Sequence, residues 1–114
     1  MDMVTINQLL IELVEKGGSD LHLVAGMPPC IRKNGNLLAL DLPALRDDDI
    51  EGMIIPILKD YQKEQLEREW ELDFSYSISG CARFRGNIMY QRGSLSAVFR
   101  AVPFNIPDFD TLGL

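Results

Sequence analysis

The sequence has few of the residues that bind metals or form disulfides. It contains two cysteines and one histidine in 114 residues. No two of Cys30, Cys81 and His22 have the spacing of a zinc finger or of a metalloprotease motif. We therefore expect no metal site. Because the start of the chain does not resemble a secretory signal, we expect both thiols to be reduced.

Long apolar runs are missing as well. The longest, at 53–58, is about a third of the length that a membrane-spanning helix needs, and Pro56 interrupts it. These absences predict a cytoplasmic protein. Its 46% hydrophobic and 25% charged residues are typical of one soluble globular domain with a modest core.

Positive charge is scarce. The sequence has 11 Lys and Arg residues and 17 Asp and Glu residues, which gives a formal net charge of -6. This charge repels nucleic acid and anionic lipid unless the positive charge is segregated. The chain also lacks a phosphate loop of the G-x-x-x-x-G-K-[ST] type, a G-x-G-x-x-G turn and a G-x-S-x-G elbow. We expect no nucleic-acid partner, and no catalytic residue in this chain alone.

The spacing of apolar residues predicts an α+β fold. A helical period covers Ile6 to Val14, with Thr5 as N-cap and Gly17-Gly18 as the stop, and Trp70 is expected in the core. The Asn34-Gly35 pair is typical of a two-residue hairpin turn. We expect a mostly antiparallel sheet with helices on one face. The predicted strands are 21–24, 30–32, 37–40, 72–78, 82–90 and 95–102. A helix that starts at 47 is broken by Pro56 and followed by a second helical segment at 60–69.

The character of the sequence changes after Pro103. The following stretch has two prolines and no periodicity, which is typical of a linker. We expect one domain at 1–103 and, at 104–114, the start of a linker to a further domain.

The arginines are concentrated in the second half of the domain. Arg83, Arg85, Arg92 and Arg100 lie in the stretch between Asp73 and Asp108, which contains no acidic residue. If Arg92-Gly93 forms a two-residue turn, Arg85 lies opposite Arg100 on one face of the hairpin, and Phe99 lies opposite Gly86 on the other. Two such guanidiniums form a fork for a phosphate or a carboxylate. Alternatively, these arginines meet acidic groups elsewhere in the fold or lie in water.

An ordered set of motifs gives the sequence a family resemblance. Over nearly its whole length the chain resembles the N-terminal domain of the type IV pilus retraction ATPases, the twitching-motility branch of the secretion ATPase superfamily. The motifs that carry the resemblance are Ser19–Leu23, Gly26–Pro29, Glu71–Ile78, Ala82–Arg85, Gln91–Gly93 and Leu112–Leu114.

The resemblance implies a PAS-like domain followed by a RecA-like ATPase domain, which this chain does not contain. It further implies a homohexamer at the cytoplasmic face of the inner membrane, at the pilus base, and an inner-membrane platform protein as partner. ATP and Mg would bind to the full-length protein and not stably to this fragment. Arg85 and Arg100 best match the family positions that contact the ATP phosphates, and Arg83 and Arg92 come second.

Two positions depart from the family pattern. Gly86 stands where relatives usually have a β-branched residue, and Ser79 where they have proline. A glycine within a strand often marks a bulge, and a bulge at Gly86 would separate Arg85 from Arg100. An alternative function from another class is a stand-alone PAS-like interaction or sensor module with no nucleotide role.

Overall fold

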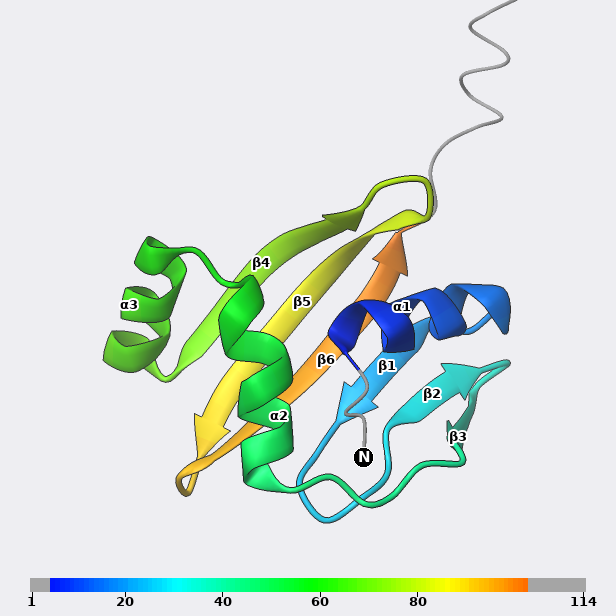
Figure 1. The fold of residues 1–114 in the computed structure, drawn as a ribbon, viewed down its shortest axis with the longest axis horizontal. Coiled ribbons are helices and arrows are strands. Elements are labelled where there is room, and N and C mark those ends of the chain that lie inside the picture. The colour runs from blue at the N-terminus through cyan, green and yellow to red at the C-terminus, as the bar shows by residue number, and fades with distance from the viewer. Residues whose placement is uncertain (1–4, 103–114) are drawn as a thin grey trace, which may run out of the picture.

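The computed structural model describes residues 5–102, which form a six-stranded antiparallel sheet and three α-helices (Figure 1). The predicted α+β class is therefore confirmed, whereas the predicted linker at 104–114 lies outside the described residues. The strand order is β3-β2-β1-β6-β5-β4, so the first and the last of the described strands pair at the centre. The strands are β1 (Asp20–Leu23), β2 (Cys30–Lys33), β3 (Asn36–Ala39), β4 (Glu71–Ile78), β5 (Ala82–Gln91) and β6 (Ser94–Val102), and the helices are α1 (Ile6–Glu15), α2 (Asp47–Ile54) and α3 (Asp60–Glu69).

Helix α1 begins at the predicted N-cap. Thr5 Oγ1 accepts a hydrogen bond of 3.2 Å from the Gln8 backbone N–H, and Gln8 Oε1 accepts one of 2.8 Å from the Thr5 N–H. This reciprocal capping box satisfies two backbone donors that a helix start otherwise leaves unpaired. The helix ends before Gly17, whose φ of 74° lies in the left-handed region that favours glycine.

Pro56 divides the second helical region, as its position in the sequence predicts. Helix α2 ends at Ile54, a short 3-10 turn covers Ile55–Ile57, and α3 starts at Asp60. A proline within a helix has no N–H to donate and its ring clashes with the preceding turn, so the α-helix cannot continue through it. The break turns α3 aside, and it lies next to β4 (Figure 1).

Helices α1 and α2 lie across the same face of the sheet (Figure 1). Apolar side chains of alternate strand residues point to this face and meet the helices, with Phe84 and Phe99 completely buried at the centre. No described helix covers the opposite face, which we call the open face. Every second strand residue therefore points to the open face, including Arg85 on β5 and Arg100 on β6.

Gly86 does not mark a bulge, so the predicted register of the hairpin holds. The pairing of β5 with both neighbours continues unbroken through Gly86. A Cβ at this position would lie 2.6 Å from Cε1 of Phe74 and 3.1 Å from Cε2 of Phe99. The two rings meet edge to face over the glycine, with centroids 5.8 Å apart. Glycine is present because the rings approach the backbone closely.

Trp70 is not in the core, which corrects the prediction from its apolar surroundings. The residue is 65% exposed and ends α3 with a φ of 64°. This left-handed conformation turns the chain from α3 into β4, and it favours glycine or asparagine at a helix end. In a tryptophan it costs on the order of 1 kcal/mol. The conformation also directs the indole away from the packed layer.

Among residues 5–102, no helix is long and apolar enough to cross a membrane. Both cysteines are free thiols, with Cys30 buried and Cys81 half-buried.

Candidate anion-binding site

The open face brings the two predicted arginines together. The β5–β6 hairpin pairs Arg85 with Arg100 and Gly86 with Phe99, which confirms the predicted register. Arg92 and Gly93, with φ of 58° and 80°, form the turn that fixes it. Because directly opposed residues point to the same side of a sheet, the two guanidiniums share one patch.

Arg100 also has an acidic neighbour, as the alternative reading of the arginines predicted, although the sequence did not identify the residue. Strand β1 pairs with β6 so that Asp20 lies opposite Arg100, and Arg100 Nε donates to Asp20 Oδ1 at 3.3 Å. The Asp20 side chain is 10% exposed and the Arg100 side chain 69%. This ion pair offsets the repulsion between Arg85 and Arg100, and it uses the Nε–H while both Nη groups have no hydrogen bond within the described residues.

A hollow of about 240 Å³ lies beside the pair, and we call it the arginine hollow. Its lining comes from three neighbouring strands: Asp73 on β4, Arg85, Gly86 and Asn87 on β5, and Val98 and Arg100 on β6. Asn87 Nδ2 donates to Asp73 Oδ1 at 2.8 Å and to Glu71 Oε2 at 3.3 Å, which fixes these carboxylates along the β4 side. Arg85 makes no ion pair within residues 5–102, so its guanidinium is available to a ligand.

The two secondary candidates lie at different distances from this pair. Arg83 is two residues from Arg85 on the same strand and the same face, opposite Val102. Arg92 is in the turn at the far end of the hairpin. From the rise per residue of an extended strand, it lies about 20 Å from Arg85. In this domain the fold therefore brings Arg85 and Arg100 together with Arg83 close by, and it does not bring Arg92 to them.

The donors of the arginine hollow fit a phosphate or a carboxylate. Guanidinium groups present planar, multiple N–H donors that match the spacing of such oxygens, and they keep their charge at any physiological pH. Asp73, which lines the hollow, and Asp20, which pairs with Arg100, offset part of the positive charge, so an anion bound there depends on direct hydrogen bonds from the guanidiniums. A pair of arginines binds and stabilises negative charge, and it cannot accept a proton.

Sequence and structure comparisons connect this domain to one group of proteins. The chain is 38% identical over 109 residues to the type IV pilus retraction ATPase PilT of Pseudomonas aeruginosa, which covers 96% of this chain. It is 33% identical to the type IV pilus ATPase PilU of the same organism, over 94% of this chain. A crystal structure of the pilus retraction motor PilT with bound ADP superposes with a TM-score of 0.84 and 38% identity over 97% of this chain. The chain is homologous to the N-terminal domain of the PilT-type ATPases.

The homology covers one part of those proteins. The chain spans about a third of the relatives' length, namely 32% of the P. aeruginosa PilT and 33% of the chain in the ADP-bound PilT structure. The Legionella pneumophila ATPase DotB shares the fold, with a TM-score of 0.76 at 20% identity, and covers the whole of this chain. No family model matches the chain.

Proposed function

We propose that this chain is the N-terminal domain of a hexameric pilus-retraction motor ATPase that drives twitching motility. In this proposal it forms the ring together with a C-terminal RecA-like ATPase domain and neighbouring subunits. The observation that carries the proposal is the adjacency of Arg85 and Arg100 beside the arginine hollow, in a chain homologous to the N-terminal domain of PilT.

The arginine hollow is the part of the domain that suits a nucleotide. Arg85 and Arg100 would contact the phosphates of ATP bound between this domain and the ATPase domain, and Arg83 and Arg92 are the second candidates. ATP and Mg belong to the full-length protein, where the phosphate groups supply the charge that the guanidiniums stabilise. The PilT structure with bound ADP supports nucleotide use by the whole protein.

The proposed setting is the cytoplasmic face of the inner membrane at the pilus base, with the pilus inner-membrane platform protein as partner. The names of PilT and PilU as type IV pilus ATPases support this setting. Nucleic acid is not a proposed partner, because the net charge of -6 repels a polyanion.

The test is ATP hydrolysis by a protein that extends beyond Leu114, with its mass measured in solution. Turnover by a hexamer is the expected result. The opposite result, an extended protein without hydrolysis, would favour the alternative of a stand-alone PAS-like interaction or sensor module. One observation favours that alternative: the ion pair with Asp20 gives Arg100 a partner without any nucleotide.

Asp20 provides a separate test of how Arg100 is held. With Asp20→Asn, the Arg100 guanidinium loses its charged acceptor and is oriented less well, and we expect kcat of the extended ATPase to fall about tenfold with little change in KM. Stability should change by less than about 1 kcal/mol, because the Arg100 side chain is mostly exposed. Steady-state kinetics and a thermal melt check both expectations.

Glu12→Gln is the matched control for Asp20→Asn. It removes an exposed ion pair of Glu12 with Lys16, 3.6 Å apart on α1, by the same change of carboxylate to amide. Its kinetics should equal those of the wild type. If Asp20→Asn also keeps full activity, Asp20 serves only to offset charge on the sheet.

A further inference from the structure

A third arginine lies in line with Arg85 and Arg100 on the open face. Strand β2 pairs with β1 so that Arg32 lies opposite Asp20, and Asp20 in turn lies opposite Arg100 on β6. Arg100 lies opposite Arg85 on β5. Because directly opposed residues point to the same side of a sheet, the four side chains form one row across four neighbouring strands. We call it the arginine row.

The arginine row continues the arginine hollow toward β2. Neighbouring strands lie about 4.8 Å apart, so the row spans about 14 Å from Arg85 to Arg32 and leaves about 10 Å between the backbones at Arg100 and Arg32. Two arginine side chains are long enough to lean together over that gap. In the sequence Arg32 is far from the other arginines, and only the pairing of β1 with β6 brings it into line with them.

The guanidinium of Arg32 is oriented by the turn that follows it. Arg32 Nη1 donates to the Gly35 carbonyl at 3.2 Å, and the Arg32 carbonyl accepts from the Ser19 N–H at 2.8 Å. Arg32 is half-buried, whereas Arg85 and Arg100 are exposed. It makes no ion pair within residues 5–102. Because a guanidinium carries five N–H donors, most of those of Arg32 are available to an anion.

Asp20 lies between the arginines without blocking the row. Its Oδ1 accepts from Arg100 Nε at 3.3 Å, and its side chain is only 10% exposed. An aspartate side chain is short, so the longer arginine side chains on both sides extend past it. Three arginines against one aspartate leave the row positive, and the carboxylate reduces the repulsion between guanidiniums on neighbouring strands.

The two ends of the row differ in charge. At the β4 end, Asp73 lines the arginine hollow, and Asn87 holds the carboxylates of Asp73 and Glu71 on that side. At the other end Arg32 lies opposite Leu37 on β3, the edge strand of the described sheet. A negative group that extends beyond the arginine hollow is therefore repelled on the β4 side and attracted on the β2 side.

A row of separated guanidiniums fits an anion whose charged groups follow one another in a chain. Each guanidinium offers planar N–H donors that match the oxygens of one phosphate group. We propose that Arg32 is a specificity-determining residue, which contacts the third phosphate group of a triphosphate whose other phosphates are held by Arg85 and Arg100. A diphosphate has one group fewer and leaves Arg32 unengaged. Such a role rests on the proposed function, because it extends the ATP phosphate site along the open face.

The test compares pyrophosphate with tripolyphosphate on the 114-residue chain, without metal ions and at constant ionic strength. We expect both anions to shift the NMR signals of the Arg85 and Arg100 Nε–H groups in a saturable way, and only tripolyphosphate to shift that of Arg32. Arg32→Gln should weaken tripolyphosphate binding about fivefold and pyrophosphate binding less than about twofold. Equal weakening of the two anions, or an Arg32 signal that tripolyphosphate leaves unchanged, would overturn the proposal.

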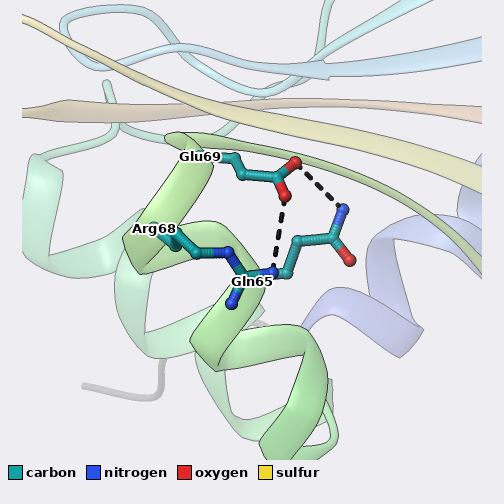
Figure 2. A network of polar contacts seen from close by, with 3 residues as sticks. All are labelled: Gln65, Arg68 and Glu69. Carbon is teal, nitrogen blue, oxygen red and sulfur yellow. Dashed lines mark hydrogen bonds and ion pairs between the residues drawn. The ribbon is translucent and has the colours of Figure 1, made fainter.

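Two controls separate a direct contact from general attraction of anions. Lys33→Gln removes the same charge from the next residue of β2, which points to the opposite face, and should change both affinities by less than about twofold. Arg68→Gln removes an arginine on α3 that Glu69 already engages at 3.4 Å (Figure 2), and should change neither affinity. If Lys33→Gln weakens tripolyphosphate as much as Arg32→Gln does, the attraction is general and the role of Arg32 is wrong.

The extended protein separates failure of this role from failure of the proposed function. In an active ATPase, Arg32→Gln should raise KM for ATP about fivefold and leave inhibition by ADP nearly unchanged. Equal effects on ATP and ADP would overturn the role of Arg32 while the motor assignment stands. An extended protein without hydrolysis would contradict the motor assignment, and the two inorganic anions, which need no turnover, would then decide the role of Arg32.

Discussion

Arg85→Ala is expected to lower ATP hydrolysis by the extended protein by about 1000-fold, and Arg100→Ala by a similar factor. An arginine that touches a transferring phosphoryl group stabilises charge that develops in the transition state, so its loss is felt mainly in kcat. Both side chains line the arginine hollow, and no described carboxylate pairs with Arg85. Steady-state hydrolysis measured with hexameric protein is the assay.

The stability of the fold should hardly change in Arg85→Ala. Two like charges directly opposed on a hairpin destabilise it by up to about 1 kcal/mol, so removing Arg85 relieves repulsion with Arg100. We expect Tm of Arg85→Ala to stay at or slightly above that of the wild type. Loss of activity without loss of stability separates a functional residue from a structural one.

Three other arginines serve as comparisons. Arg68→Ala, on α3 and paired with Glu69, should keep full activity. Arg83→Ala and Arg92→Ala should have smaller effects than Arg85→Ala, because neither residue lines the arginine hollow. Activity near wild type in both Arg85→Ala and Arg100→Ala would show that the phosphate role is wrong, even if the extended protein is an ATPase.

Phe99→Ala is expected to have the largest effect on stability. Its ring is completely buried, packs against Phe74 and lies over Gly86 on the strand next to it. Truncation of such a ring leaves a cavity and costs about 3–5 kcal/mol. In a domain of this size that corresponds to a fall in Tm of roughly 15 °C or more. Denaturant unfolding of the 114-residue chain measures the change.

Val98, the residue before Phe99, provides the matched control. Val98 precedes Phe99 on β6 and points to the open face, where it is half-buried. Val98→Ala should therefore cost about 1 kcal/mol or less. Comparable losses for the two variants would mean that the sheet is packed on both faces, contrary to the arrangement in Figure 1.

Local features of the sequence predicted much of the fold. Thr5 and Gln8 begin α1, Pro56 breaks the second helical region, and the Asn34-Gly35 and Arg92-Gly93 turns fix two hairpins. Each of these features depends on residues close in sequence, because helix capping, the proline ring and the geometry of tight turns determine the local backbone conformation. The register of the second hairpin followed from its turn, and with it the adjacency of Arg85 and Arg100.

Features that depend on packing were missed. The sequence left open why a glycine stands within β5, and only the structure shows that Gly86 accommodates two aromatic rings from the neighbouring strands. Trp70 looked like a core residue because it precedes an alternating apolar strand, yet its left-handed backbone turns it outward. The periodicity of apolar residues predicts which of them share a face of a helix or strand. It does not predict the direction of a side chain where the chain reverses between two elements.

Short-range geometry and the order of the motifs were therefore enough to predict the helices, the hairpins, the class of fold and the arginine pair. The pairing of β1 with β6, which places Asp20 against Arg100 across 80 residues of chain, follows from the folded domain alone. The tertiary structure also decided that Trp70 joins Tyr90 and Glu67 around one hollow. Pairing between distant strands is selected by the burial of a shared core, and no local pattern encodes which strands will meet.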